Sequence, residues 1–484
     1  MQDERHHRGL VERLVSWSST RRDQAECILP DPSNTLTDRL NIALNSSGSG
    51  YVLQLCQNAR YLIQAPILFA ASNQEISTVG YPTGDERAIL VVNGPVFNGT
   101  GHTTAIDGTC ADCDGVKLRN IQIDGTRQGA PPTSGGANIE MGGPNSDQVI
   151  EYVRSFDPRG WSCLHVQEGG LTCTNVLVQN NDIGPCGSDA FQEWADGVSI
   201  ACQNATVRNN LIHDPTDGGI VLFGSPGSLV ENNTIWIVNS TLLGGINMVD
   251  IDPWGGNYTG SVVQNNTIIG GFATDSDTDG DARGTDLHDA IVKIGIAVGP
   301  RTWFSDRYGS NVSFSGNVIG NTLTGAFGFG IAVTSARNFT IEDNILSGNT
   351  SFIGSSGPNC TLEAVPSPVP FLVAPANVTE SSIQSDFETV ANGDGLTCIL
   401  PPDGDYWPYG GQPTSPSSPP TSVPEQTQAN DGPSDGTKAG IAIGVIVGVV
   451  AAALAAWYIR KWAIRRQQLQ HAASLGDKGF EEGQ

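Results

Sequence analysis

Lysine is almost missing from this sequence, and charged residues of either sign are few. The 484 residues include five lysines and 59 glycines, and charged side chains make up only 15% of the chain. This composition indicates many tight turns and few exposed helices. The formal net charge is −25. Nucleic-acid binding requires a basic surface, so that class of function is excluded, and acidic polysaccharides would be repelled unless a cation bridged the charges.

Cysteine is absent after residue 398, although ten cysteines precede that point: Cys27, Cys56, Cys110, Cys113, Cys163, Cys173, Cys186, Cys202, Cys360 and Cys398. An even number confined to one part of the chain predicts disulfides formed in an oxidising compartment, with a pairing that spacing does not give. Cys110 and Cys113 have the spacing of a redox or zinc pair, but no second such pair accompanies them, which favours a disulfide or free thiols.

Twelve N-x-S/T sequons are typical of the same compartment, although a fold that uses Asn and Thr would also produce some of them. They begin at Asn45, Asn98, Asn204, Asn232, Asn239, Asn257, Asn265, Asn311, Asn338, Asn349, Asn359 and Asn377.

Residues 1–30, predicted to be disordered, contain no apolar stretch of the kind that forms a signal peptide. Residues 439–459, in contrast, run for 21 positions without a charge, which is long enough for a transmembrane helix. Arg460 and Lys461 follow directly, so the positive-inside rule places residues 460–484 in the cytosol. We therefore expect a single-pass plasma-membrane protein with an extracellular domain and a leader absent from this sequence. The alternative is a tail-anchored protein whose domain faces the cytosol.

The region between these ends divides into a predicted folded domain, 31–400, and a Pro/Ser/Thr-rich stalk, 401–438, which we expect to be extended and O-glycosylated. Within the domain a six-residue pattern recurs, with an apolar residue first, Asn fourth and an apolar residue sixth. The fourth positions are Asn181, Asn210, Asn233, Asn266, Asn317 and Asn344, and the step of 51 is read as two coils, one of which lacks the Asn. Stacked at a bend, this Asn would tolerate left-handed backbone and bond along the stack.

Short apolar strands lie between these segments, each preceded by a small or acidic turn, as in Asp196-Gly-Val-Ser-Ile200 and Gly218-Gly-Ile-Val-Leu222. Strands of three to five residues that alternate inward and outward cannot bury their apolar face alone, so stacked coils are expected. The fold class is therefore an all-β, right-handed parallel β-helix with a C-terminal transmembrane helix. Coils are predicted over about 85–355, with residues 31–100 forming an N-terminal cap.

The segments Val116-Lys-Leu-Arg-Asn-Ile-Gln-Ile-Asp-Gly125 and Val230-Glu-Asn-Asn-Thr-Ile-Trp236 resemble the right-handed parallel β-helix, or pectin-lyase-like, superfamily. The whole arrangement also resembles uncharacterised fungal membrane-anchored surface β-helix proteins. This resemblance implies a fold, since the superfamily includes lyases, hydrolases and adhesins. The Asp-Asp, Gly-His-Gly and Arg-x-Lys motifs of its polygalacturonase branch are absent here.

Turns at the same point of successive coils should stack into one row, which here would be rich in carboxylates. The candidate catalytic residues are Asp196, His213, Asp217, Asp289 and Lys293. Paired carboxylates suit glycoside hydrolysis, and a carboxylate-held cation with a lysine base suits a lyase acting on uronates. The alternative is a row of solvated acidic turns.

Four aspartates form the sharpest local motif, with the spacing of a calcium-binding loop: Asp275, Asp277, Asp279 and Asp286. The twelfth position is Asp instead of the usual Glu, so a calcium-free acidic loop is the alternative reading. Trp161, Trp254 and Trp303 occur in turn-like contexts and could stack on sugar rings or pack in the core. His165 is read as structural.

Two hypotheses follow for the function. The first is a membrane-anchored, carbohydrate-active protein that cleaves cell-wall polysaccharide as a lyase or hydrolase. The second is a non-catalytic surface protein that binds glycans or organises the cell wall.

Overall fold

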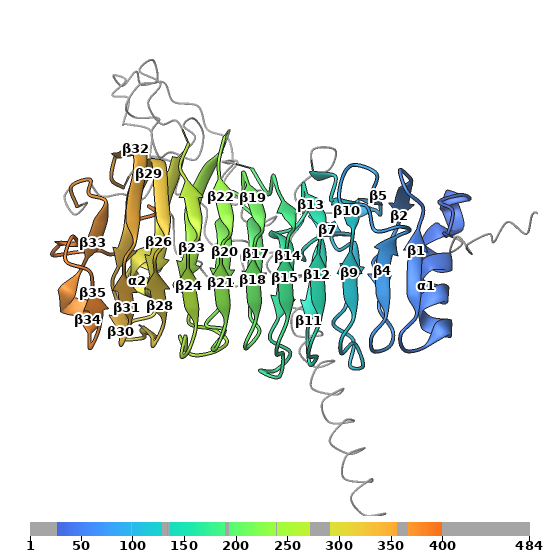
Figure 1. Cartoon of the computed structure of the whole chain (residues 1–484), viewed down its shortest axis with the longest axis horizontal. Coiled ribbons are helices and arrows are strands. Elements are labelled where there is room, and N and C mark those ends of the chain that lie inside the picture. The colour runs from blue at the N-terminus through green and yellow to red at the C-terminus, as the bar shows by residue number, and fades with distance from the viewer. Residues whose placement is uncertain are drawn as a thin grey trace, which may run out of the picture. The chain divides into compact units, whose positions relative to one another are not determined.

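The computed structural model of the chain describes residues 27–398 except 98, 128–132, 134–135, 189–192, 239, 272–290 and 356–365. These residues belong to one compact unit, Met1–Pro413. Its strands stack coil upon coil in parallel, as Figure 1 shows, and the only antiparallel pair in the described part is β6 (Val96–Phe97) with β7 (Thr100–Gly101). The predicted parallel β-helix is therefore confirmed.

Most coils contribute one strand to each of three ladders, which we call faces A, B and C in chain order. Face A contains β1 (Val52–Leu55), β4 (Glu75–Thr78), β9 (Lys117–Arg119), β12 (Val149–Glu151), β15 (Leu177–Gln179), β18 (Thr206–Arg208), β21 (Leu229–Glu231), β24 (Val262–Gln264), β28 (Asn317–Ile319), β31 (Thr340–Glu342) and β35 (Ser382–Ile383).

Face B contains β2 (Arg60–Ile63), β5 (Ala88–Val92), β10 (Ile121–Asp124), β13 (Arg154–Phe156), β16 (Asp182–Ile183), β19 (Leu211–His213), β22 (Thr234–Trp236) and β25 (Thr267–Ile269). Face C contains β3 (Ile67–Leu68), β8 (Ile106–Asp107), β11 (Ile139–Gly142), β14 (Ser162–Gln167), β17 (Asp196–Ile200), β20 (Gly218–Leu222), β23 (Thr241–Met248), β26 (Ile291–Val298), β33 (Phe371–Val373) and β36 (Glu388–Thr389). The long strands β29 (Thr322–Val333) and β32 (Ile345–Phe352) join faces B and C.

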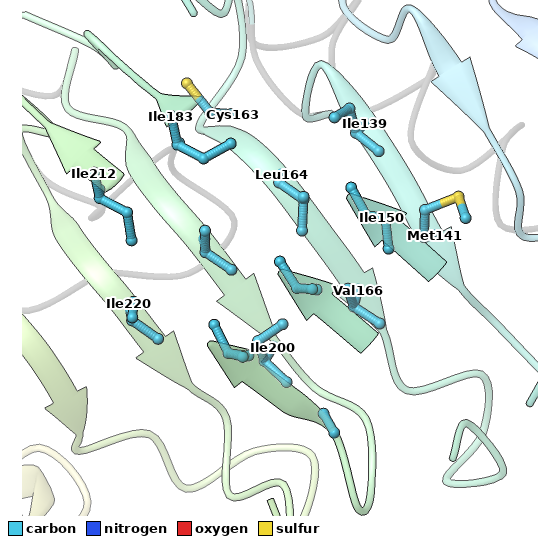
Figure 2. Close-up of a cluster of buried hydrophobic side chains, with 14 of the residues drawn as sticks. Ile139, Met141, Ile150, Cys163, Leu164, Val166, Ile183, Ile200, Ile212 and Ile220 are labelled. Carbon is cyan, nitrogen blue, oxygen red and sulfur yellow. The ribbon is translucent and has the colours of Figure 1, made fainter. Parts of the chain in front are cut away.

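The core is a column of aliphatic side chains inside the coils. In a typical face A strand the central residue is buried and its neighbours are not, as the alternation of side chains in a strand requires. Successive coils place Val178, Val207 and Val230 in direct register. Figure 2 shows the same inward stacking, with Ile150 of face A, Ile183 of face B and Leu164 of face C among the buried side chains. Because each coil covers only part of its apolar surface, the stack supplies the rest.

The Asn-Asn dipeptide has two separate roles at the turn from face A to face B. The first Asn adopts left-handed backbone, with φ of 55° at both Asn180 and Asn209. The second Asn points inward and forms a ladder, in which Asn181 Nδ2 donates to Asn210 Oδ1 and Asn210 Nδ2 donates to Asn233 Oδ1, both at 2.9 Å. The turn conformation and the ladder thus belong to neighbouring residues, whereas the sequence reading assigned both to one Asn.

The ladder continues through Asn266 to Asn321, so the assignment of Asn317 to it was wrong. Asn266 Nδ2 donates to Asn321 Oδ1 at 3.0 Å, and Val263 lies in register with Val318. The repeat was therefore aligned four residues too early at this coil. The same bond shows that the long step is one coil with a large excursion, and not two coils.

Helix α1 (Leu36–Ser47), preceded by the 3-10 turn η1 (Ser33–Thr35), covers the first coil with its buried residues Leu36, Leu40 and Leu44. Coil strands begin at Val52 and continue to Thr389, which extends beyond both ends of the predicted 85–355. At the other end, Gln384 takes the place of Asn, because its Oε1 accepts a hydrogen bond from Asn344 Nδ2. The remaining elements are α2 (Pro300–Phe304), η3 (Pro375–Asn377) and a small ladder of β27 (Ser313–Phe314), β30 (Ala336–Arg337) and β34 (Val378–Thr379).

The described cysteines are all disulfide-bonded, as the even cysteine count predicted. The pairs are Cys27–Cys56, Cys110–Cys113, Cys163–Cys186 and Cys173–Cys202, and Cys398 is also disulfide-bonded. Three of the four pairs span 23 or 29 residues, which is about one coil. The C-x-x-C pair forms a disulfide, which favours the structural reading over a zinc site.

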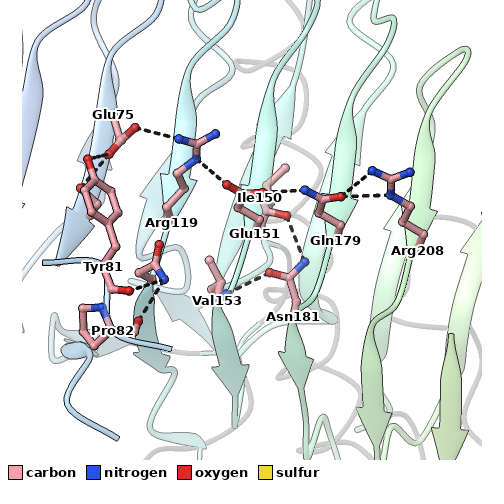
Figure 3. Close-up of polar contacts among 12 residues, drawn as sticks. Glu75, Tyr81, Pro82, Arg119, Ile150, Glu151, Val153, Gln179, Asn181 and Arg208 are labelled. Atoms are coloured by element: carbon pink, nitrogen blue, oxygen red, sulfur yellow. Dashed lines mark hydrogen bonds and ion pairs between the residues drawn. The ribbon is translucent and has the colours of Figure 1, made fainter. Parts of the chain in front are cut away.

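Charged and amide side chains alternate along the outside of face A. Arg119 contacts both Glu75 and Glu151, and Arg208 donates to Gln179, whose amide in turn donates to Glu151 (Figure 3). These ion pairs are partly shielded from water, and pairs at a protein surface typically contribute about 0–1 kcal/mol each. The arrangement mainly prevents like charges from stacking in a parallel ladder.

In the described part of the chain, no helix is both long and apolar enough to cross a membrane. The predicted transmembrane segment 439–459 and stalk 401–438 lie outside the described residues, so both stay predictions.

Candidate functional site

Polar side chains form an outward row on face C, and next to them a column of glycines runs through the same strands. Five glycines are stacked in register: Gly197, Gly219, Gly245, Gly295 and Gly330. A Cβ at Gly219 or Gly245 would lie 2.4 Å from the carbonyl oxygen of the next glycine in the column. Only glycine permits so close an approach. The glycine column lets β17, β20 and β23 approach closely, next to the outward side chains of these strands.

Asp196, the first residue of β17, is the centre of a polar cluster on this face. Its Oδ2 accepts a hydrogen bond from Ser199 Oγ at 2.7 Å, and its Oδ1 accepts one from the Gly218 backbone N–H at 2.8 Å. Ser199 Oγ in turn lies 3.0 Å from Ser162 Oγ on β14. The carboxyl group is only 4% exposed, so these partners replace water around it.

A histidine–carboxylate pair lies on the neighbouring coils. His165 Nδ1 is 2.8 Å from Glu140 Oε2, and His165 lies in register with Ser199. Glu140 also accepts hydrogen bonds from Gln167 Nε2 at 2.9 Å and from the Ala137 N–H at 2.7 Å. These contacts fix the ring orientation and leave Nε2 as the nitrogen that can exchange a proton.

Two further residues complete the cluster on the side of β23. Asn247 is 1% exposed, and its Oδ1 has no hydrogen-bond partner among the described residues. A Cβ at Gly218 would lie 2.9 Å from both Asn247 Nδ2 and Asp196 Oδ1, so the amide and the carboxyl group flank this glycine. Asp250 follows β23. An unsatisfied buried acceptor beside a buried carboxyl group is unusual in a purely structural arrangement.

Both aspartates have strongly raised pKa values. Burial raises the pKa of Asp196 from 3.8 to about 7, although the bonds from Ser199 and Gly218 and the nearby His165 lower it. Burial, followed by the charges of Asp196 and Asp252, raises the pKa of Asp250 to about 8. The cluster thus holds carboxyl groups that are partly protonated at neutral pH, which is what a general acid requires.

The structure brings Asp217 to this cluster but separates the other described candidates from it. Asp217 directly precedes the Gly218 N–H that binds Asp196, and it is buried. Lys293 on β26 is also buried, and its Nζ donates to the Thr397 carbonyl at 3.0 Å beneath the C-terminal segment. Lys293 therefore contacts the protein's own backbone and does not lie on an open outward face.

His213 lies on face B, whereas Asp196 lies on face C. It is the last residue of β19, and its nitrogens lie 3.7 Å from Asp182 and 3.8 Å from Asp214. Its ring stacks on Trp236 with centroids 5.4 Å apart. A pocket of about 580 Å³ adjoins these two rings. The predicted single row of His213 with Asp196 is therefore wrong, because the two side chains belong to different ladders.

The three candidate tryptophans have different environments. Trp161 is half-buried and meets the ring of His165 edge-on, with centroids 4.7 Å apart. Trp254 donates its Nε1–H to the Ala201 carbonyl at 2.9 Å. Trp303, on α2, is 2% exposed in a second apolar cluster outside face C. Of the three, Trp161 is beside the polar cluster.

The remaining predictions fall on residues outside the described part. Asp289 and the four residues of the calcium motif, Asp275, Asp277, Asp279 and Asp286, all lie there, so their roles stay predictions. Within the described part, no group of three or more His, Cys, Asp or Glu side chains is placed to hold a metal ion.

Sequence reasoning missed Glu140, Ser199 and Asn247 and assigned His165 a structural role. The available signal was register: counting outward positions along face C places Glu140, His165, Ser199, Val221 and Asn247 in one row. That count requires the strand boundaries of each coil, which the sequence leaves uncertain by a residue or more.

Several solved structures are similar to this chain at low identity. An alginate lyase from Paenibacillus sp. str. FPU-7 is 14% identical, with 65% of this chain and 95% of that chain covered and a TM-score of 0.40. DFA-IIIase from Arthrobacter chlorophenolicus A6 is 12% identical, with coverage of 75% and 93% and a TM-score of 0.43. Endo-xylogalacturonan hydrolase from Aspergillus tubingensis is 14% identical, with coverage of 79% and 96% and a TM-score of 0.35.

No curated protein matches the chain. The family described as "Right handed beta helix region" matches residues 161–364. That range includes six consecutive face A strands, from β15 to β31, together with the asparagine ladder described above. Residues 161–364 therefore match this family, and the described coils have the parallel β-helix fold.

Proposed function

We propose that this chain is a glycan-cleaving protein that uses the polar cluster on face C for general acid–base chemistry. The observation that carries the proposal is the Asp196 carboxyl group, which is buried beside a histidine–glutamate pair and has a pKa of about 7. In this reading Asp196 donates a proton to the leaving glycosidic oxygen. His165, oriented by Glu140, takes the proton from water or from the sugar ring.

An acid paired with a base serves two reactions on sugars. A hydrolase base activates water, and a lyase base removes the proton next to a uronate carboxylate. Trp161, which packs edge-on against His165, could place a sugar ring beside the base. The resemblance of the repeat to the β-helix superfamily supports a polysaccharide as the substrate class.

The predicted location follows from the sequence outside the described residues. The segment 439–459 would anchor the protein in the plasma membrane, the stalk 401–438 would hold the domain away from it, and the basic residues after it would place the tail in the cytosol. The disulfides support an oxidising, extracellular compartment for the domain. Glycosylation at the sequons and calcium binding at Asp275–Asp286 belong to the same proposal.

The test compares Asp196→Asn with Asp343→Asn on a panel of neutral and acidic polysaccharides. Asn can occupy the space of Asp196 but cannot donate a catalytic proton, so cleavage should fall by about 100-fold or more. Asp343 is exposed at a left-handed turn position that other coils fill with Asn, so its variant is the matched control.

The pH dependence separates catalysis from a structural role. Activity of the wild type should fall as the pH rises through about 7, because the acid must be protonated. If the wild type cleaves no member of the panel, or if Asp196→Asn retains the activity and its pH profile, the enzymatic proposal fails. The protein would then be the glycan-binding alternative.

A further inference from the structure

The pocket on face B lies away from the acid–base cluster and has a different chemistry. Its volume is about 580 Å³, which is within the range of small-molecule sites and suits a sugar unit or two. One wall consists of the stacked rings of His213 and Trp236, and Leu211 and Tyr152 contribute apolar surface, being 48% and 37% exposed. Asn180 and Asn209 line it with amides from consecutive coils. Apolar ring faces next to amide groups are the surfaces that bind saccharides.

The remaining wall contains a buried cation, Arg87. Its side chain is 6% exposed, Nε donates to the Gly84 carbonyl, and Nη1 donates to the Tyr152 carbonyl, each at 2.9 Å. Among the described residues, no carboxylate lies within ion-pair distance of it. A guanidinium has five N–H donors, so several remain for a ligand after these two contacts. Burial lowers the pKa of Arg87 below its usual value, which reflects the cost of keeping this charge away from water.

The one carboxylate in the pocket lining is already engaged. Asp182 lies 3.6 Å from Arg154 and 3.7 Å from His213. The charges of Asp182 and Asp85 favour the charged form of Arg87 and that of Arg154 opposes it, but none of the described carboxylates is close enough to form an ion pair with Arg87. In a chain with a net charge of −25, this pocket is a local exception to the acidic surface.

We propose that this pocket binds an acidic saccharide, with Arg87 holding the carboxylate of a uronate unit. The sugar ring would pack against Leu211, Tyr152 and the His213–Trp236 pair, and the amides of Asn180 and Asn209 would bind its hydroxyl groups. Bidentate binding of a carboxylate is the interaction for which a guanidinium is best suited. The site is independent of the chemistry proposed for face C, and it would hold a chain to the protein whether or not that chain is cleaved.

Binding is measured by calorimetric titration of the full chain with galacturonate and guluronate trimers and, as a neutral probe, cellotriose. We expect at least one acidic trimer to bind and cellotriose to bind at least tenfold more weakly. Arg87→Gln should weaken acidic binding at least tenfold. Because that change also affects two buried hydrogen bonds, Leu211→Asp provides a second test, as it places a negative charge at an exposed position of the pocket. Leu171→Asp, at another exposed leucine, is the matched control and should bind as the wild type does.

Asp196→Asn should bind the acidic trimers unchanged, which distinguishes this site from the proposed catalytic one. The proposal is overturned if neither acidic trimer binds, if cellotriose binds equally well, or if Leu211→Asp and a folded Arg87→Gln both bind like the wild type. It is also overturned if Asp196→Asn abolishes binding, because the acidic trimers would then occupy face C.

Discussion

Replacing Asn210 by alanine tests whether the inward asparagine ladder holds the coils together. Asn210 is fully buried, and its Oδ1 accepts hydrogen bonds from the backbone N–H of Asn181 at 3.0 Å and from Asn181 Nδ2 at 2.9 Å. Alanine removes the acceptor for both donors and leaves a small cavity. An unsatisfied buried donor costs about 1–3 kcal/mol, so with the cavity the free energy of unfolding should fall by about 3–6 kcal/mol.

The neighbouring residue provides the control. Asn209 is exposed and has a φ of 55°, a conformation that glycine adopts without strain. Asn209→Gly should therefore cost less than about 1 kcal/mol. Both variants are compared with the wild type by urea unfolding of the full chain, which is monitored by tryptophan fluorescence and circular dichroism. If Asn210→Ala unfolds within about 1 kcal/mol of Asn209→Gly, the ladder does not stabilise the coils and the reasoning is refuted.

Three further predictions concern other parts of the chain. The pKa of Asp196 is about 7 in the folded protein against 3.8 ordinarily, so its contribution to stability is present at acid pH and lost as the pH rises from about 4 to about 7. Between pH 5 and pH 8 the wild type should lose roughly 3 kcal/mol of unfolding free energy in urea, and Asp196→Asn should not show this loss. Gly219→Ala should lower the melting temperature by several degrees, because its Cβ would lie 2.4 Å from a backbone oxygen. In the control Gly84→Ala the Cβ would meet only the end of the Glu86 side chain, so the melting temperature should not fall. If the acidic motif at Asp275–Asp286 binds calcium, EDTA should lower the melting temperature of the wild type. A variant with four Asp→Asn changes in that motif should not respond to EDTA. If EDTA changes the melting temperatures of the two proteins equally, calcium is removed from the proposal.

The interior of the coils could be predicted from the sequence because its spacing is repeated. Val178, Val207 and Val230 recur with the same neighbours, and one inward apolar residue per short strand is enough to indicate stacked coils. The prediction failed at Asn317, where the correct ladder residue is Asn321 in a Gly-Asn sequence. Gly320 takes the left-handed position that Asn occupies in other coils, so the Asn-Asn dipeptide that signals the turn is missing. Asn317, four residues before Asn321, was taken for the ladder residue instead.

The outward face could be predicted only in part, because its residues do not repeat. Asp196 and Asp217 were identified from the sequence, because each is followed by a glycine at the start of a strand. The two residues lie together in the structure. Glu140 and Asn247 were missed, because their outward position depends on the register of strands with different lengths. His213 was placed with Asp196 because both were assigned to turns that lead into strands. His213 is instead the last residue of β19 on face B, and the turn to face C comes after it.

The division between interior and surface explains how one solenoid can carry two unrelated sites. Inward residues such as Ile212 and Asn210 are fixed by stacking, whereas outward residues on the same strand contact only their neighbours above and below. His213, one residue from Ile212, can therefore belong to a pocket on face B while Asp196 and His165 form an acid–base cluster on face C. Since a side chain on one face does not contact the other, changes at Leu211 should affect saccharide binding and leave the pH profile of cleavage unaltered. Coupled effects of Leu211→Asp on both properties would show that a single bound glycan spans the two faces.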